Sequence, residues 1–93
     1  MSASAAAALV LPVRLTHLEA QTCLLALQQQ AGPAGDLVLD ASALVDFDSA
    51  ALATLLALRR WAQAQGRSLQ MVRVPARLAE LVALYGVGEL LPA

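Results

Sequence analysis

Apolar residues gather along the chain in short blocks, and three of these blocks predict strands. Residues 8–15 are rich in Val and Leu, Pro12 restricts this strand to a sheet edge or a bulge, and the pattern fits either one strand or a hairpin. Residues 37–39 form an uninterrupted apolar run that is typical of a buried strand. Residues 68–74 alternate between apolar and polar side chains, as a strand with one buried face does.

A helix is predicted after each strand. Thr16 and Glu19 match a capping box, in which two side chains satisfy the free N–H groups at a helix start. The first helix is therefore expected to have Thr16 as its N-cap and to run through Gln30. A second helix is predicted over residues 49–65, and Gly66 is expected to end it.

The third predicted helix begins at Pro75 and ends at Gly86. Strands that alternate with helices predict an α/β fold, in which helices pack against a small mixed sheet with a parallel portion. We expect one domain over residues 1–93, with residues 1–5 frayed. The buried stripe of the third helix is expected to be Leu78, Leu81, Val82 and Tyr85.

The second predicted helix has two contrasting sides. Leu residues are expected to cover the sheet on one side, whereas Ala fills the side on which a solvent-facing helix normally carries charge. The Ala surface reflects either the high helix propensity of Ala or a docking surface anchored by Arg60 and Trp61, two residue types enriched at binding hot spots. The Leu side is Leu52, Leu55, Leu56 and Leu58, and the Ala side is Ala50, Ala53, Ala57 and Ala64, bordered by Ser49, Arg60, Thr54 and Trp61.

Composition narrows the classes of protein to consider. The chain has 93 residues, of which 59% are hydrophobic and 3% aromatic, enough for one domain with an aliphatic core. A net charge of −1 excludes the basic surface that nucleic-acid binding requires. Apolar runs are shorter than the roughly 18 residues of a membrane span, so no membrane insertion is expected. One Cys cannot form an internal disulfide, which favours a soluble, cytoplasmic protein.

Three polar residues surround the start of the second predicted helix. Either Asp48 or Ser49 is expected to be its N-cap, accepting hydrogen bonds from free backbone N–H groups. The Ser49 hydroxyl has two further candidate roles. It can contact a partner, or it can carry a phosphate, which the helix start would favour and which Asp46 and Asp48 would repel.

No other residues form a catalytic or metal-binding pattern. His17 is expected at the surface and Cys23 in the core. Asp40, Asp46 and Asp48 either cap turns and helix ends or hold a cation, and the capping role is favoured. No metal, cofactor or enzymatic activity is therefore expected.

Two segments resemble STAS domains, the family of anti-sigma factor antagonists and sulfate-transporter tails. The run "LVLDASALVDFDSAALATLL" at residues 37–56 is similar to the central motif, a strand ending in Asp and then Asp-Ser or Asp-Thr opening a helix; Asp40, Asp48 and Ser49 match it. The run "VPARLAELVALYGVGELL" at residues 74–91 is similar to the final segment of the family. The resemblance implies a STAS-like fold whose ligand is a protein and which performs no chemistry.

Two branches of that family imply different partners. In the anti-sigma factor antagonists, a kinase-type anti-sigma factor phosphorylates the Ser that Ser49 matches, but their motif continues with Ser or Thr and then Gly, where this chain has Ala50 and Ala51. In the small MlaB-type STAS subunit of the Mla phospholipid transporter, a single Thr or Ser opens the helix, and the chain ends soon after a Leu-Pro pair such as Leu91 and Pro92. The second branch is the better match.

The MlaB-type branch implies a cytoplasmic subunit that is peripheral to the inner membrane through its complex. Its implied partner is the ATPase subunit of the ABC transporter, with the start of the Ser49 helix at the interface. A subunit of a larger sensory assembly is a third alternative. The expected contact residues are Asp48, Ser49, Ala50, Ala53, Thr54, Ala57, Arg60 and Trp61, and Ser49 is also the candidate phosphorylation site.

Overall fold

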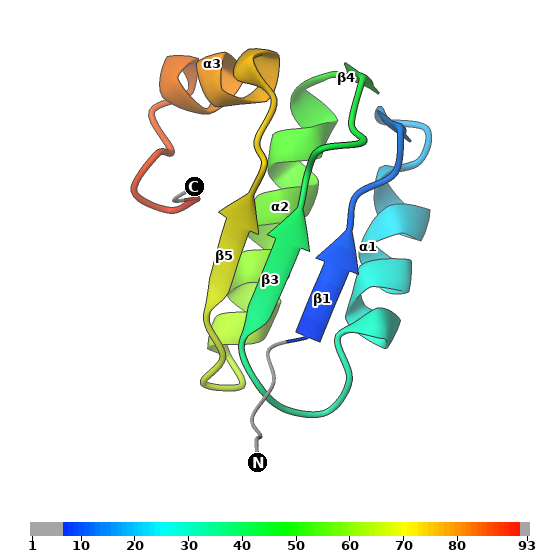
Figure 1. Ribbon diagram of the computed structural model, residues 1–93, viewed down its shortest axis with the longest axis vertical. Helices are drawn as coiled ribbons and strands as arrows, with labels where there is room; N and C mark the ends of the chain where they lie inside the picture. The colour runs from blue at the N-terminus through cyan, green and yellow to red at the C-terminus, as the bar shows by residue number, and fades with distance from the viewer. Residues whose placement is uncertain (1–6, 92–93) are drawn as a thin grey trace.

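The computed structural model describes residues 7–91 and contains a main sheet of three strands (Figure 1). The strands of this described part are β1 (Ala7–Val10), β2 (Arg14–Leu15), β3 (Leu37–Asp40), β4 (Asp46–Phe47) and β5 (Leu69–Val72). The main sheet has the order β1-β3-β5 and both of its pairs are parallel, with Leu39 of β3 level with Leu9 of β1 and Met71 of β5. Strands β2 and β4 pair in parallel beyond the carboxyl ends of β1 and β3.

The expected α/β fold is confirmed, with two differences in its strands. The alternation of elements predicts a mixed sheet, whereas every strand pair within residues 7–91 is parallel, because each crossover returns the chain in the same direction. Residues 8–15 form neither one continuous strand nor a hairpin: they divide into β1 and β2, which lie in different sheets, around Pro12, which has no N–H to donate to a ladder. The expected fraying of residues 1–5 lies outside the described residues.

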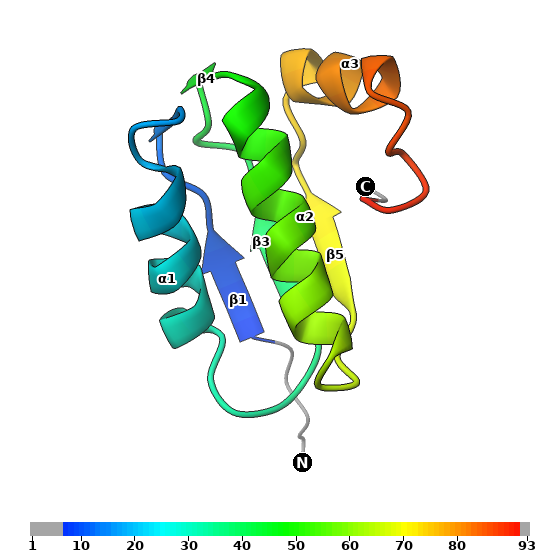
Figure 2. The ribbon, with the colours of Figure 1, turned by 180° about the vertical axis from the view of Figure 1, so that it is seen from behind.

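Within residues 7–91, three helices complete the fold: α1 (Ala20–Gln30), α2 (Ser49–Gln63) and α3 (Ala76–Leu84). Helices α1 and α2 lie side by side on one face of the main sheet, as Figure 2 shows from behind, and they pack against each other. Helix α3 lies across the carboxyl end of the sheet (Figure 1). In the described part of the chain, no helix covers the opposite face of the sheet.

Leu side chains from the sheet and the helices form the core. Leu39 at the centre of the sheet is fully buried, and so are Leu55 and Leu58 of α2, which confirms that the Leu side of this helix covers the sheet. Leu56, on the border of that side, is half-buried and packs against the core. Burying a Leu side chain contributes about 1.5–3 kcal/mol, so this layer stabilises the fold.

One of the two hydrogen bonds of the predicted capping box forms, from Thr16 N–H to the Glu19 carboxylate, and it closes a turn before α1 and not the first turn of the helix. Glu19 Oε1 accepts hydrogen bonds from Thr16 N at 2.8 Å and from Thr16 Oγ1 at 2.7 Å. The Thr16 hydroxyl in turn accepts from Leu18 N at 3.2 Å, and the helix begins at Ala20. The observed N-cap of α1 is Glu19, so the predicted N-cap at Thr16 is wrong by three residues, because the two side chains bond each other within the turn.

The other two helices end close to their predicted bounds. Helix α2 ends two residues before the predicted Gln65, and Gly66 follows with a φ of +70°, which favours Gly over other residues. After α3, Gly86 has a φ of +69°, and Val87 N donates back to Val82 O at 3.2 Å. These turns redirect the chain into β5 and into the final segment.

Candidate functional site

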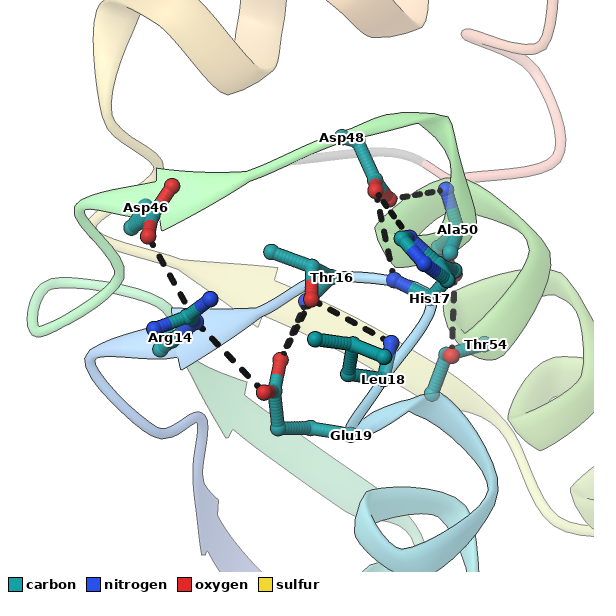
Figure 3. A network of polar contacts seen from close by, with 9 residues as sticks. All are labelled: Arg14, Thr16, His17, Leu18, Glu19, Asp46, Asp48, Ala50 and Thr54. Atoms are coloured by element: carbon teal, nitrogen blue, oxygen red, sulfur yellow. Dashed lines mark hydrogen bonds and ion pairs between the residues drawn. The ribbon is translucent and has the colours of Figure 1, made fainter.

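The carboxyl end of the main sheet brings together the turn before α1, strand β4 and the first turn of α2 (Figure 3). Asp48 is the N-cap of α2: its Oδ1 accepts a hydrogen bond from Ala50 N at 2.8 Å. Its Oδ2 lies 3.2 Å from both the backbone N and the ring Nδ1 of His17. One carboxylate thereby fixes the start of α2 and ties it to the turn before α1.

The same contacts lower the pKa of Asp48. The hydrogen bond from Ala50 N–H is the main cause, and the hydrogen bonds and charge of His17 add to it. Asp48 is therefore an ionised cap at neutral pH, and a negative charge suits the positive end of a helix. His17 is exposed, as expected.

Ser49 is left free by this arrangement. It is the first residue of α2 and is exposed, and within residues 7–91 no hydrogen bond uses its hydroxyl. The choice between the two candidate N-caps is thus decided in favour of Asp48. The Ser49 hydroxyl can donate and accept hydrogen bonds toward another molecule without loosening the helix.

The acidic residues that the sequence places near one another have separate partners. Asp46 lies 3.5 Å from Arg14 Nε, which is also 3.4 Å from Glu19 (Figure 3). Asp40 accepts from Ser42 N at 2.9 Å and pairs with Arg73 at 3.1 Å, and its pKa is lowered chiefly by the Ser42 N–H. Each carboxylate thus caps a turn or forms an ion pair. Among the described residues, no group of three or more His, Cys, Asp and Glu side chains is placed to hold a metal ion.

A groove of about 400 Å³ runs beside Ser49. Phe47, Asp48 and Ser49 form one wall, and α3 forms the other. On the α3 wall, Leu84 is 79% exposed and Tyr85 is 55% exposed. The predicted burial of Tyr85 is wrong, because α3 ends at Leu84 and Tyr85 lies at its C-cap, beyond the stripe that covers the core.

Two charged side chains complete the α3 wall. The Arg77 guanidinium lies 5.1 Å from the centre of the Phe47 ring, an attractive cation–π geometry, and connects α3 to the segment before α2. Glu80 lines the groove one turn further along α3. The groove therefore has an apolar part and a polar rim, which is the composition of protein–protein interfaces.

Comparison with known proteins decides the family. A family model described as "Mlab, STAS domain" matches residues 2–92. The chain belongs to this MlaB-type STAS family. Domains of the STAS family are generally non-enzymatic and mediate protein–protein interaction. No curated protein matches the chain.

The STAS domain exposes only some of the side chains expected to meet a partner. Ser49, Ala53 and Arg60 are exposed along α2, and Ala50 and Ala57 are half-buried beside them. Thr54 is only 4% exposed, and its hydroxyl donates to Ala50 O at 2.9 Å, so it supports the first turn of α2 from inside.

The two expected anchors lie far from Ser49. Arg60 and Trp61 are eleven and twelve residues further along α2, which corresponds to roughly 16–18 Å at 1.5 Å per residue. Trp61 is half-buried under the guanidinium of Arg67, at 5.5 Å, so it has a structural contact within the domain. The Ser49 groove and the Arg60 end of α2 are therefore two separate parts of the expected surface.

No helix of the described residues is both long and apolar enough to cross a membrane.

Cys23, expected in the core, is half-buried and packs against the core, and this burial raises the pKa of its thiol.

Proposed function

We propose that this STAS domain is a non-catalytic subunit that binds the ATPase of a Mla-type phospholipid ABC transporter and supports the assembly and activity of that complex. The observation that carries the proposal is the free, exposed Ser49 hydroxyl beside a groove with exposed Leu84 and Tyr85. The MlaB-type family match supports the choice of partner. The domain would act at the cytoplasmic side of the inner membrane, held there by its partner.

The groove suits a protein ligand better than a lipid. Its walls place Asp48, Arg77 and Glu80 around Phe47 and Leu84, whereas a phospholipid chain requires a long apolar cavity. Exposed Tyr side chains are frequent binding hot spots, since they offer a large apolar ring with a polar tip. We infer that the ATPase inserts an apolar side chain against Leu84 and Tyr85 and bonds Ser49 at the rim.

The remaining contact residues extend this interface along α2. Ala50 and Ala53 lie within one turn of Ser49, and their small side chains let the backbone of a partner approach closely. Ala57 and Arg60 continue the same side of the helix and would contact the ATPase further away. Asp48 would act indirectly, by holding the helix start in place.

Purification of the tagged chain with its native partners tests the proposal. The protein is isolated gently from detergent-solubilised membranes and from cytosol, and the proteins that accompany it are identified. Recovery of an ABC ATPase with its membrane subunit supports the proposal. Recovery of a soluble kinase-like anti-sigma factor, with phosphate on Ser49 by intact mass, overturns it in favour of an anti-sigma factor antagonist.

The contact site is tested in the recovered complex. Tyr85→Ala should release the partner, whereas Leu25→Ala, which changes an exposed Leu on α1, should retain it. If both variants retain the ATPase, the groove is not the binding site.

A further inference from the structure

A second apolar groove, of about 520 Å³, lies between β1 and α1, on the side of the domain away from α3 (Figure 2). Val10, at the end of β1, is 59% exposed, and Leu18, in the turn before α1, is 69% exposed. Both line this groove, together with Leu11, Pro12 and Cys23. Exposed apolar side chains that gather in one place on a small domain mark an interaction surface.

Helix α1 beside this groove carries no charged residue over its whole length. A helix on the surface of a monomeric protein normally presents charged side chains to water. The exposed positions of α1 that line the groove are instead Thr22 and Gln30. Depletion of charge combined with exposed apolar groups is typical of an interface core.

The outer edge of β1 adds backbone groups to this surface. Leu11 N donates to Asp40 O at 2.9 Å, so Leu11 points its N–H toward β3. Directions alternate along a strand, so Ala8 and Val10 point their N–H and C=O groups away from β3. Within residues 7–91 no strand pairs with this edge. An edge strand of this kind is a template for another strand.

We infer that a second copy of the chain covers this surface, with the two β1 strands pairing antiparallel across a twofold axis. Strand β1 of the second copy has the same unpaired backbone N–H and C=O groups at the same spacing, as an isologous interface requires. The grooves of two copies also do not repel each other: the charged residues of the groove are Arg14 and Glu19, which lie 3.4 Å apart and have opposite charges. The pairing joins two three-stranded sheets into one and covers Val10 and Leu18 of both copies.

This inference does not rest on the proposed function. The Ser49 groove is lined by the start of α2 and by α3, whereas the free edge of β1 lies opposite β5 in the sheet, beside α1 (Figures 1 and 2). Because β1 has only four residues, the interface is small, and a weak dimer is expected.

Sedimentation equilibrium of the full chain tests the inference. The average mass should rise from 9.7 kDa toward twice that value between about 1 μM and 1 mM, the range of a weak complex. Leu18→Glu should raise the dimer dissociation constant at least about tenfold. The matched control Leu25→Glu changes an exposed Leu of α1 that does not line the groove, and it should leave the constant unchanged. If Leu18→Glu does not fold, Thr22→Lys, an exposed change in the groove, replaces it.

Amide hydrogen exchange identifies the strand involved. Val10 N–H should exchange more slowly at high protein concentration, whereas Met71 N–H, on the outer edge of β5, should not change. A chain that stays monomeric up to 1 mM overturns the inference, with 1 mM being about the weakest affinity of interest. A dimer that Leu25→Glu weakens as much as Leu18→Glu also overturns it, and so does a Val10 exchange rate that is independent of concentration. Either of the last two results would mean that the two copies associate through another surface, which would leave the groove to a different protein.

Discussion

Replacing Arg67 with Leu should destabilise the domain more than any other single Arg change. Arg67 is 5% exposed and follows the turn that ends α2. Its guanidinium donates to Ala31 O and Gly35 O, both at 2.6 Å, and to Gly32 O at 3.0 Å. It also bonds Ala34 O and Gln65 Oε1. One side chain thus binds the loop after α1 to the turn after α2.

The magnitude follows from which of these groups water can reach. Ala31 is buried, so its carbonyl would lose its donor, at a cost of about 1–3 kcal/mol. The carbonyls of the exposed Gly32, Ala34 and Gly35 can bond water instead. Loss of the stacking on half-buried Trp61 adds roughly 0.5–1 kcal/mol. Because Leu avoids the desolvation of a buried ion, part of this cost is recovered, and the net loss should be about 2 kcal/mol.

Urea unfolding followed by circular dichroism and by the fluorescence of Trp61 measures the loss. A change of about 2 kcal/mol in a domain of this size corresponds to roughly 8–16 °C in Tm. Arg67→Lys should show a partial loss, since an ammonium group lacks the planar fork that reaches several carbonyls at once. Arg60→Leu, an exposed change on α2, is the control and should stay within about 0.5 kcal/mol. An Arg67→Leu variant as stable as the wild type would refute the reasoning.

Three further outcomes are expected. Ser49→Asp should weaken ATPase binding about tenfold, because it places a second negative charge beside Asp48, and Ser49→Ala should weaken it less. If calorimetry gives both variants the affinity of the wild type, Ser49 is not in the interface. Tyr85→Ala should weaken binding about 30-fold with little change in Tm, as the loss of a hot-spot side chain does; a Tm loss without an affinity loss would make Tyr85 structural. The free energy of unfolding should fall as the pH drops below about 4, because folding lowers the pKa values of four carboxyl groups. The stability that these ionised carboxylates contribute is fully present above their unfolded pKa values and is lost as the pH falls through their folded pKa values. An unfolding free energy that does not change between about pH 5 and pH 2 would contradict this prediction. The groups with lowered pKa are Glu19, Asp36, Asp40 and Asp48.

Local patterns predicted the helices and the buried strand because each depends on neighbours within a few residues. The apolar run in β3 and the Leu spacing in α2 are such patterns, and both are confirmed. The start of α1 was not predictable in this way, since Thr16 and Glu19 bond each other in a turn that precedes the helix. The motif specifies the hydrogen bonds and leaves the helix boundary open.

The features that sequence reasoning missed depend on residues far apart in the chain. Arg67 meets carbonyls more than thirty residues away, and nothing around it in the sequence marks it as buried. The α3 wall of the groove was also missed, because helical spacing placed Tyr85 on the core stripe although the helix ends before it. A Tyr directly before the Gly that ends a helix is the one local signal for this exposure.

In the proposed interface, Asp48 caps the helix and Ser49 contacts the partner, two roles that a single residue could not perform equally well. A side chain that caps a helix commits its oxygen to the backbone and loses it for recognition. Here the Asp48 carboxylate accepts the hydrogen bond from Ala50 N–H and contacts His17, and the Ser49 hydroxyl remains free at the rim of the groove. Thr54 bonds the Ala50 carbonyl from the inner side of the same turn. The first turn of α2 is thus held from both sides, so a partner that binds Ser49 meets a surface that needs little further ordering, which reduces the entropy cost of association.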